Sequence, residues 1–504
     1  MTMDYDNLSD PIFHHAHTRP DAIAVIDGRE RLDYRNFAAL VAKASIYLRD
    51  LGVAEGDRVG FLLTNTIDHL VLMFAVARIG ATIVELSIED NVETLAATAA
   101  KYDIRTIFAE AHAPAIAGVR QIPVGLFWRR EIEGKSGDHR TAAPGEKLLV
   151  IMLTTGSTGI PSAWSLTHRV FFRTSEVHEE RWRRAYKWDS LREHAHFLLA
   201  YPLRFCWFQV LVVLQMRAGA TMVIVPEYNR TSDLLRAFAA WENAVAFVTP
   251  NTCRYFLRVA PPTGMLLPNF RLLEAGAGPL AAEEKRGMIA HVTPNFAEIY
   301  GSTGGGLITA LTAEEMSDKA DTVGRPPPGA TIEIVDRDGR VLPSGETGEV
   351  RCRPLWALRV GDEPKFPGTE RIEDGWCYPA DIGFLDAQGY LHLKGRAADL
   401  IRREGTEIFA PEIEGVIASH PAVAEVAVIG VPSPTRGEEI VAFVVKHGAL
   451  DHDELARYCR TRLAPERLPD RVFYADSLPK LAGQKPDRLR LQALAAAEIA
   501  RKSG

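Results

Sequence analysis

A run of hydroxyl-bearing and glycine residues near residue 155 has the composition of a phosphate-binding loop. It directly follows the apolar segment Leu148–Leu153 and consists of Thr154, Thr155, Gly156, Ser157, Thr158 and Gly159. Glycine lets a backbone approach a ligand closely, while successive N–H groups and hydroxyls donate hydrogen bonds to phosphate oxygens. The run has neither the spacing nor the lysine of the G-x4-G-K-[ST] loop. Taken alone, it indicates either a phosphate site or an ordinary surface turn.

Four later segments also concentrate glycine, hydroxyl and charged residues. Two are small-residue turns, Ala275–Leu280 and Tyr300–Thr303. A third contains Asp381 and Arg396, and a fourth contains Lys485. Any one of these segments taken alone is a weak signal of a ligand site.

The elements that must position these residues alternate between apolar strand-like runs and amphipathic segments. Leu148–Leu153 reads as a buried strand, and Thr94–Lys101 followed by Arg105–Ala109 reads as helix then strand. Ser232 is expected to cap a helix that runs through Trp241. This rhythm predicts an α/β fold with largely parallel sheets.

The pattern of predicted secondary structure changes twice in the second half of the chain. Short strands with Gly- and Asp-containing turns begin near residue 331 and predict a β-rich lobe. Beyond residue 400 a compact α+β unit is expected, with strands at Val423–Val431, Ile440–Lys446 and Arg471–Ala475 and a helix at Asp453–Leu463. We therefore expect a large N-terminal domain of stacked sheets with helices and a β-rich lobe, residues 1–397. A small C-terminal domain, residues 398–504, would follow.

Composition excludes several classes of protein. The 504 residues are 47% hydrophobic and 24% charged, as in ordinary globular proteins, and the net charge of −7 is unlike that of a general nucleic-acid binder. Five cysteines without CxxC spacing indicate neither a disulfide framework nor a zinc site. No apolar stretch approaches the roughly 20 residues that span a bilayer, and the first residues do not read as a signal peptide. A cytoplasmic location is expected, with no nucleic-acid partner.

Together and in this order, the segments resemble the adenylate-forming acyl-activating superfamily, which includes acyl-CoA synthetases, firefly luciferase and the adenylation domains of peptide synthetases. The resemblance spans nearly the whole chain. Besides the segments above, it rests on Pro20–Ile26, Leu32–Phe37, Gly52–Leu63, Val323–Gly329, Gly345–Val350 and Glu407–Pro432.

The resemblance implies an activity and its substrates. Such enzymes activate a carboxylate with ATP and Mg²⁺, release pyrophosphate, and hold an acyl-adenylate whose acyl group usually passes to the thiol of coenzyme A. It implies that Lys485 bridges the carboxylate and the α-phosphate, that Asp381 binds the ribose and that Arg396 lies near ribose and phosphates. Tyr300 would flank the adenine, and Thr303 would donate to the α-phosphate. The remaining nucleotide-binding residues would be the loop at 154–159, Gly276, Ala277, Gly278, Pro279, Gly301 and Ser302.

Two positions depart from the family pattern where charge matters. The lysine that usually ends the phosphate loop is Ser162, and the glutamate that usually follows the Tyr300 motif and helps hold magnesium is Gly304. Magnesium keeps waters and binds largely through substrate phosphates, so its binding is weakened rather than excluded. The metal ligands are therefore unknown. At a third position, the hinge between the domains, this chain has Ala398.

The acyl site also departs from the common pattern, because Phe205 replaces a gating histidine. An aromatic or short hydrophobic acid is expected, in a pocket formed by Phe205, Trp207, Phe247, Thr249, Gly304 and Gly305. In the family the small domain rotates after adenylation, which would place Gly405 near a pantetheine channel. Arg181–Arg184 is a basic stretch that could attract coenzyme A phosphates, or a solvated helix face.

Three functions remain open at this point. The first is an acyl-CoA synthetase. The second is a stand-alone adenylating enzyme that loads a carrier protein or an amine. The third is a degenerate homologue that binds nucleotide without turnover, which Ser162 and Gly304 would favour. The acid, the oligomeric state and the pathway are not determined by the sequence.

Overall fold

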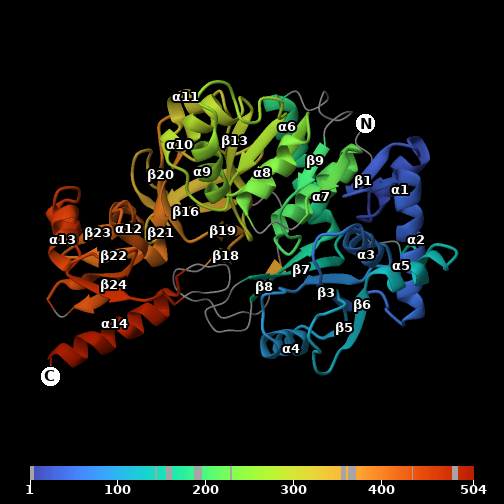
Figure 1. Ribbon diagram of the computed structural model, residues 1–504, viewed down its shortest axis with the longest axis horizontal. Helices are drawn as coiled ribbons and strands as arrows, with labels where there is room; N and C mark the ends of the chain where they lie inside the picture. Colours follow the sequence, from blue (N-terminus) through green and yellow to red (C-terminus); the bar gives the residue numbers. More distant parts are fainter. Residues whose placement is uncertain are drawn as a thin grey trace.

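The computed structural model describes residues 5–141, 145–154, 162–186, 196–226, 230–353, 359–360, 370–433, 435–479 and 486–503. Two mainly parallel sheets, a β-rich lobe and a C-terminal α+β unit follow one another along the chain (Figure 1). The C-terminal unit lies at the left of Figure 1, and the two parallel sheets lie in the body to its right.

The first sheet has eight strands, of which the inner six run parallel and the two edge strands run antiparallel to their neighbours. In spatial order these are β14 (Gly306–Leu311), β13 (Phe296–Ser302), β12 (Leu272–Ala275), β11 (Ala244–Val248), β9 (His196–Leu199), β10 (Thr221–Ile224), β1 (Ile23–Asp27) and β2 (Glu30–Asp33). Apolar runs such as β11, buried at every residue, fit a parallel sheet covered on both faces.

The second sheet has seven strands and carries the predicted phosphate loop. Its order is β17 (Arg359–Val360), β8 (Ser162–Thr167), β7 (Leu148–Thr154), β4 (Thr82–Glu85), β3 (Arg58–Leu62), β5 (Ile104–Glu110) and β6 (Arg120–Val124). Strands β7 and β8 are antiparallel neighbours, with Thr154 opposite Ser162. Residues 155–161, which join them, lie outside the described residues.

Helices fill the space between the two sheets and cover their outer faces. The inner helices are α1 (Asp10–Thr18), α2 (Tyr34–Asp50), α3 (Ile67–Arg78), α6 (His168–Tyr186) and α7 (Cys206–Ala218). All but one residue of α3 are buried, which explains why its sequence is apolar on every side. The outer helices are α4 (Val92–Lys101) on the second sheet and α8 (Thr231–Ala239), α9 (Pro250–Val259), α10 (Ala282–Gly287) with η2 (Met288–Val292), and α11 (Met316–Lys319) on the first. Helix α5 (Leu126–Glu133) packs on α2.

The β-rich lobe is a six-stranded antiparallel sheet. Its strands are β15 (Thr331–Val335), β16 (Gly348–Arg353), β18 (Arg371–Glu373), β19 (Trp376–Tyr378), β20 (Asp381–Leu385) and β21 (Leu391–Arg396). Its small core includes Ile308 of β14, so the lobe packs directly on the edge of the first sheet.

The C-terminal unit has its own five-stranded sheet and its own apolar clusters. It comprises η3 (Ala397–Asp399), β22 (Leu400–Arg403), β23 (Thr406–Phe409), α12 (Ala410–Ala418), β24 (Val423–Ser433), β25 (Gly437–Lys446), α13 (His452–Arg460), η4 (Pro465–Arg467), β26 (Arg471–Ala475) and α14 (Arg488–Ser503). All residues of these clusters come from Ile401 onward.

The structure confirms most of the predicted elements and corrects three local expectations. Strand β26 matches its prediction at both ends, but Ser232 lies inside α8, whose cap position is Arg230. The polar sequence Glu131–Arg140 predicts a surface loop, but this stretch begins inside α5, where Ile132 is buried. The Arg181–Arg184 stretch is not a uniformly solvated face, because Arg181 is 6% exposed.

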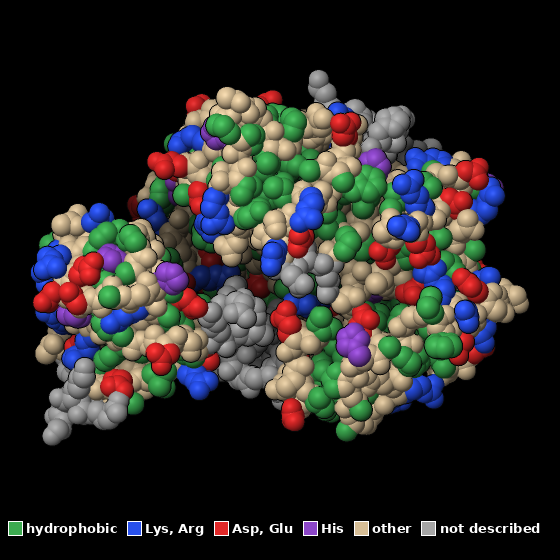
Figure 2. All heavy atoms as spheres, in the orientation of Figure 1, with side chains coloured by type: hydrophobic (Ala, Val, Ile, Leu, Met, Phe, Trp, Pro, Cys, Tyr) green, Lys and Arg blue, Asp and Glu red, His purple; other side chains and the backbone are tan. Residues whose placement is uncertain are grey.

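The surface mixes acidic and basic side chains, as Figure 2 shows for one face. The same view shows a hollow between the C-terminal unit and the rest of the molecule. Within the described part of the chain, no helix combines the length and the apolar character needed to cross a membrane.

Candidate active site

Several of the predicted site residues lie at the carboxyl ends of neighbouring parallel strands. Thr249 follows β11, Gly276 follows β12, and Tyr300 to Ser302 end β13. Ligands of open α/β sheets bind outside the carboxyl ends of the strands, because there the loops diverge and backbone groups are free to bind. The topology of the first sheet therefore brings three separate sequence motifs to one edge.

Asp381 joins this edge to the β-rich lobe. The Tyr300 hydroxyl donates to Asp381 Oδ2 at 2.5 Å, and Arg396 Nε lies 3.0 Å from Asp381 Oδ1. Asp381 and Arg396 are partners in register on β20 and β21, which fixes their spacing. Burial, and then the Asp381 carboxylate, raise the pKa of Tyr300 well above its usual value, so the hydroxyl stays protonated and can donate. A carboxylate oxygen can accept more than one hydrogen bond.

The exposure of this trio is graded. The Asp381 side chain is 8% exposed, whereas that of Arg396 is 55% exposed. Because the inner carboxylate is held by two donors, its orientation is fixed before a ligand arrives. Arg396 is the member that can move, and it lies one residue before the η3 turn that leads into the C-terminal unit.

The turn that follows β12 leaves no room for a larger residue at its first position. A Cβ on Gly276 would lie 2.8 Å from the Ile299 carbonyl oxygen and 3.2 Å from Phe247 Cζ. Ala277 has a φ of 65°, and Ala277, Gly278 and Pro279 are exposed. The close approach of Gly276 and Phe247 places the predicted nucleotide turn against the predicted acyl site.

The hairpin from β13 to β14 contains the predicted residues Gly301, Ser302, Thr303, Gly304 and Gly305. A Cβ on Gly301 would overlap the carbonyl oxygen of Gly306, so only glycine fits there. The Gly305 N–H donates to Ser302 Oγ at 2.9 Å and closes the turn around Thr303. The turn is tight, and it directly follows Tyr300 along the chain.

Glu370 contacts this turn and was not among the predicted site residues. The Gly304 N–H donates to Glu370 Oε1 at 2.9 Å, and the Ser302 hydroxyl and the Cys377 thiol also hydrogen-bond to this carboxylate. Burial raises the pKa of Glu370 above its usual value. The sequence carried no signal for it, because no spacing rule connects residue 370 to residue 304.

The predicted acyl residues divide into an inner pair and an outer residue. The rings of Trp207 and Phe247 lie 6.2 Å apart, and the Trp207 ring lies 4.6 Å from that of His178. Phe205, immediately before α7, is 48% exposed and lies under the Arg204 guanidinium. The Thr249 N–H donates to the Tyr201 hydroxyl at 3.2 Å.

A buried polar cluster borders this inner pair. Arg181 pairs with Glu274 of β12, and the Trp182 indole donates to the same Glu274 oxygen at 3.0 Å. Burial holds the pKa of His178 well below its usual value, so its imidazole is neutral. Among the described residues, Trp207 Nε1 and His178 Nε2 are buried without a hydrogen-bond partner.

Part of the predicted site falls outside the described residues. Thr155 to Gly159 and Lys485 belong to that part, and nothing is described of the side chains of Thr154 and Ser162. The anchors of the Lys485 segment are described, since the Asp487 N–H donates to the Pro479 carbonyl at 2.8 Å. Arg488, at the start of α14, pairs with Asp399 at 2.6 Å and with Glu414 at 3.1 Å.

Gly405 lies in the exposed turn between β22 and β23. Its φ is 83° and that of the preceding Glu404 is 52°, the two positive angles of a tight hairpin turn. No heavy atom lies within 4 Å of where its Cβ would be. The turn is therefore exposed at Gly405, while Glu404 beside it pairs with Arg436 at 3.3 Å.

The described residues contain no group of three or more histidine, cysteine, aspartate or glutamate side chains arranged to hold a metal ion. That part of the chain thus contains no all-protein metal cage. Magnesium in phosphoryl-transfer sites needs only one or two carboxylates together with the phosphates of the substrate. Glu370, beside the Ser302 hydroxyl, meets that smaller requirement.

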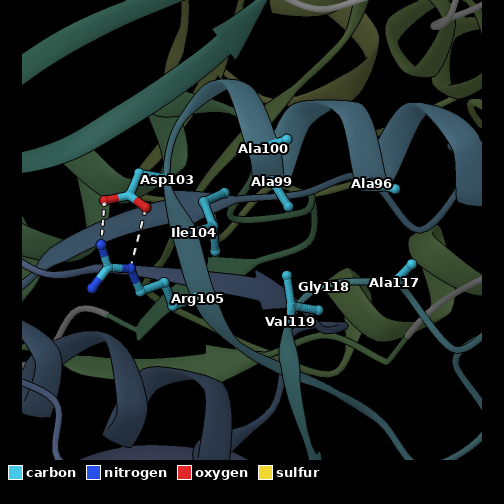
Figure 3. A pocket seen from close by; sticks show the side chains of 9 residues that line it. All are labelled: Ala96, Ala99, Ala100, Asp103, Ile104, Arg105, Ala117, Gly118 and Val119. Atoms are coloured by element: carbon cyan, nitrogen blue, oxygen red, sulfur yellow. Dashed lines mark hydrogen bonds and ion pairs between the residues drawn. The ribbon is translucent and has the colours of Figure 1, made fainter.

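A surface pocket of about 390 Å³ lies away from this edge, between α4 and the strands β5 and β6 (Figure 3). Asp103 and Arg105 point toward one another on its wall and hydrogen-bond to each other. Three alanines of α4 and the chain at 117–119 make up much of the remaining lining. Its charges are already paired, and none of the predicted site residues lines it.

Two family models match the chain. The model described as AMP-binding enzyme matches residues 12–356, and the model described as AMP-binding enzyme C-terminal domain matches residues 412–485. The chain belongs to the AMP-binding enzyme family. The predicted membership in the adenylate-forming acyl-activating superfamily is thereby confirmed.

Relatives of this AMP-binding enzyme match over most of their length. A long-chain-fatty-acid–CoA ligase of Mycobacterium tuberculosis is 26% identical over 476 residues, which are 89% of this chain and 90% of the relative. A 2-succinylbenzoate–CoA ligase of Bacillus cytotoxicus is 25% identical over 492 residues, 96% of this chain and 98% of the relative.

Solved structures confirm the fold of this AMP-binding enzyme. The o-succinylbenzoate CoA synthetase of Bacillus subtilis in complex with an acyl-adenylate superimposes with a TM-score of 0.84 at 22% identity, over 96% of this chain and 97% of that one. ATP-bound MatB of Rhodopseudomonas palustris gives a TM-score of 0.83 at 23% identity, over 97% and 99%.

Proposed function

We propose that this AMP-binding enzyme is an ATP-dependent acid–thiol ligase that converts a carboxylic acid to an acyl-adenylate and passes the acyl group to coenzyme A. The observation that carries the proposal is the Tyr300–Asp381–Arg396 trio at the carboxyl end of β13. The trio offers a fixed carboxylate for a ribose diol beside a permanent positive charge for phosphate oxygens. The full-length relatives named as CoA ligases support the same assignment.

The first step needs positive charge because two anions must meet. A carboxylate oxygen of the acid attacks the α-phosphorus of ATP, the bond from that phosphorus to the bridging oxygen breaks, and pyrophosphate leaves. Lys485 would neutralise the carboxylate and the α-phosphate, while Arg396 and the Thr303 hydroxyl would hold the phosphate oxygens. Such oriented groups stabilise charge where it develops in the transition state.

In the second step the sulfur of coenzyme A attacks the acyl carbon. The bond from that carbon to the AMP oxygen breaks, AMP leaves, and the thiol proton is lost to solvent. We place the nucleotide- and acyl-binding domain at residues 1–397 and the mobile domain at 398–504. The separate apolar clusters of the C-terminal unit support this division. Rotation about Ala398 would exchange Lys485 for the Gly405 turn, which would line the thiol channel.

For the acid we propose an aromatic or short hydrophobic body that carries a hydrogen-bond acceptor. Trp207 and Phe247 supply an aromatic wall next to Gly276. The unpartnered Trp207 Nε1 and His178 Nε2 are buried donors, and a buried donor without a partner costs about 1–3 kcal/mol unless a ligand satisfies it. Trp207→Phe should therefore reduce turnover of an acid with such an acceptor more than turnover of the same acid without it.

Magnesium is the metal that such a site would use. Bound with ATP, it neutralises phosphate charge, and Glu370 with Ser302 are the residues that would hold it or its waters. ATP, Mg²⁺ and coenzyme A are thus the proposed cofactors and substrates, and a carrier protein or an amine is the alternative acceptor. We propose a cytoplasmic location.

Carboxylate-dependent release of pyrophosphate tests the proposal. A panel of aryl and aliphatic acids is supplied with ATP and Mg²⁺, and Lys485→Ala is compared with Lys446→Ala, a lysine at the exposed end of β25 in the same domain. We expect one acid to give release that Lys485→Ala loses by roughly a hundredfold or more while Lys446→Ala keeps it. Adding coenzyme A or an amine then identifies the acceptor. Release with no acid, although ATP binds, would favour a nucleotide-binding homologue without turnover.

A further inference from the structure

The space at residue 304 is occupied by two side chains from other elements. A Cβ on Gly304 would lie 2.5 Å from Trp164 Cη2 and 2.9 Å from Glu370 Oε1. Trp164 belongs to β8, two residues after the end of the predicted phosphate loop, and Glu370 immediately precedes β18. Any side chain at 304 would therefore have to displace an indole ring and a carboxylate.

The carboxylate of Glu370 is bound by neutral donors rather than by a cation. Its partners are the Gly304 N–H at 2.9 Å, the Cys377 thiol at 3.6 Å and the Ser302 hydroxyl. Within the described part of the chain, Glu370 forms no ion pair, unlike its neighbours Arg371 and Glu373, which lie 3.3 Å apart. Glu370 is half-buried, and a carboxylate partly removed from water without a cation is costly unless a metal ion or another cation relieves that cost.

The position of Glu370 is that of a residue serving the nucleotide. It is hydrogen-bonded to the residues on both sides of Thr303, the predicted α-phosphate donor. Arg396, a member of the ribose trio, also acts on its charge. A single carboxylate beside the phosphates is the usual protein contribution to magnesium binding in such sites.

We infer that Glu370 supplies the magnesium-binding carboxylate of this enzyme, in place of the side chain that Gly304 lacks. The inference rests on the proposed function for the presence of ATP, and it concerns the metal alone. Trp164 fits the same inference. Its indole fills the space that a side chain at 304 would need, so Glu370 is the acidic group that contacts the turn.

Metal binding to the ATP complex tests this inference without reference to turnover. Mn²⁺, which replaces Mg²⁺ in oxygen sites and is visible by electron paramagnetic resonance, is titrated into protein with ATP and no acid. Glu370→Gln keeps the shape and the Gly304 hydrogen bond and removes the charge. Glu373→Gln, three residues along the same segment, is the matched control. We expect Glu370→Gln to weaken Mn²⁺ binding roughly tenfold or more, with unchanged AMP affinity in the absence of metal.

Three results would overturn the inference or the proposal beneath it. Mn²⁺ binding to Glu370→Gln as tight as to the wild type would refute the metal role. Equal weakening of Mn²⁺ and AMP binding would also refute it and make Glu370 a residue that only positions the turn. Wild-type protein that binds neither ATP nor AMP would instead refute the proposed function. Should thermal unfolding show that Glu370→Gln does not fold, Glu370→Asp carries the test, with a weaker metal affinity again expected.

Discussion

The two ends of the proposed nucleotide site, the proposed ribose end and the proposed phosphate end, are built in opposite ways. At the ribose end, Tyr300, Asp381 and Arg396 stand at the positions that the family pattern names, and they contact one another directly. At the phosphate end, the pattern is changed at Ser162 and Gly304, and the carboxylate in that space comes from Glu370, 66 residues further along the chain. The ribose end keeps the residues of the family motif. The phosphate end keeps an acidic side chain, but that side chain comes from a different part of the sequence.

The comparison teaches that a sequence motif gives the residue at a position but does not show which side chains from other segments lie next to it. The ribose trio is specified by strand register, since Asp381 lies opposite Arg396 in one ladder. The phosphate end depends on whichever side chain reaches the turn, and Trp164 and Glu370 both reach it. The absence of a glutamate at 304 is thus weak evidence for an inactive protein.

Asp381→Asn would break the ribose end and is the largest effect that we expect. The substitution removes the charge that holds Arg396 and accepts from Tyr300, and hydrogen bonds to charged groups contribute about 1.5–3 kcal/mol each. AMP affinity measured by calorimetry should fall roughly tenfold to a hundredfold. Asp386→Asn, just beyond the same strand, removes a carboxylate bonded to Lys319 at 2.7 Å and should leave AMP affinity intact. Equal losses in both variants would contradict a specific role.

Gly304→Glu would restore the family residue at the phosphate end, yet we expect it to harm this chain. The new side chain would meet Trp164 and the carboxylate of Glu370, and overpacking costs about 1–3 kcal/mol. Thermal unfolding should report a lower midpoint for Gly304→Glu than for the wild type. Adding Trp164→Val should recover part of that loss, whereas an unaffected midpoint in the single variant would show that the space is not filled.

Tyr300→Phe sharpens the comparison because it removes one of the two donors to Asp381 and keeps the ring. We expect AMP affinity to fall about fivefold, the effect of one hydrogen bond of about 1 kcal/mol. Tyr390→Phe provides the control, since the Tyr390 hydroxyl also donates to a carboxylate, that of Glu315 at 3.0 Å, away from the site. A fall of AMP affinity in Tyr390→Phe as well would point to a general loss of stability.

Ala380→Gly is the smallest expected effect and concerns stability at the ribose end. Ala380 is buried and has a φ of 64°, a conformation that costs an L-residue about 1–2 kcal/mol. Glycine removes that strain but has more freedom in the unfolded chain, so the net stabilisation should be about 0.5 kcal/mol. Chemical denaturation should show this gain, and Ala397→Gly, at a residue without a positive φ, should show a loss. A loss in Ala380→Gly would mean that the strain is absorbed elsewhere.

The sequence was sufficient for most of the fold and for choosing Tyr300, Asp381 and Arg396 as candidate residues, because both follow from local pattern. Apolar runs predicted strands such as β7 and β26, and Tyr300, Asp381 and Arg396 were found by motif. The start of α8 differs from the prediction by two residues, because Arg230 and not Ser232 is the cap position. Such a shift keeps the buried residues Leu234 and Phe238 within the helix.

What the sequence could not predict depends on contacts between distant segments. The sequence allowed Arg181 to belong to a solvated basic face. In the structure Arg181 is buried and pairs with Glu274, which is 93 residues away along the chain. Glu370 has no fixed spacing from Gly304, and only the folded lobe brings the two together. The roles of all the predicted site residues stay predictions, and Lys485 and the loop at 155–159 also lie outside the described residues.

The crowding around Gly304 constrains the routes by which this site can change over time. No single substitution converts the present arrangement into one with glutamate at 304, because the indole of Trp164 blocks that residue until it is itself replaced. A lineage that first lost Glu370 would pass through a form with no carboxylate at the turn. An arrangement with glutamate at 304 and the present one with Glu370 are thus separated by intermediates that lose packing or a carboxylate. The effect of a change at 304 therefore depends on residues 164 and 370.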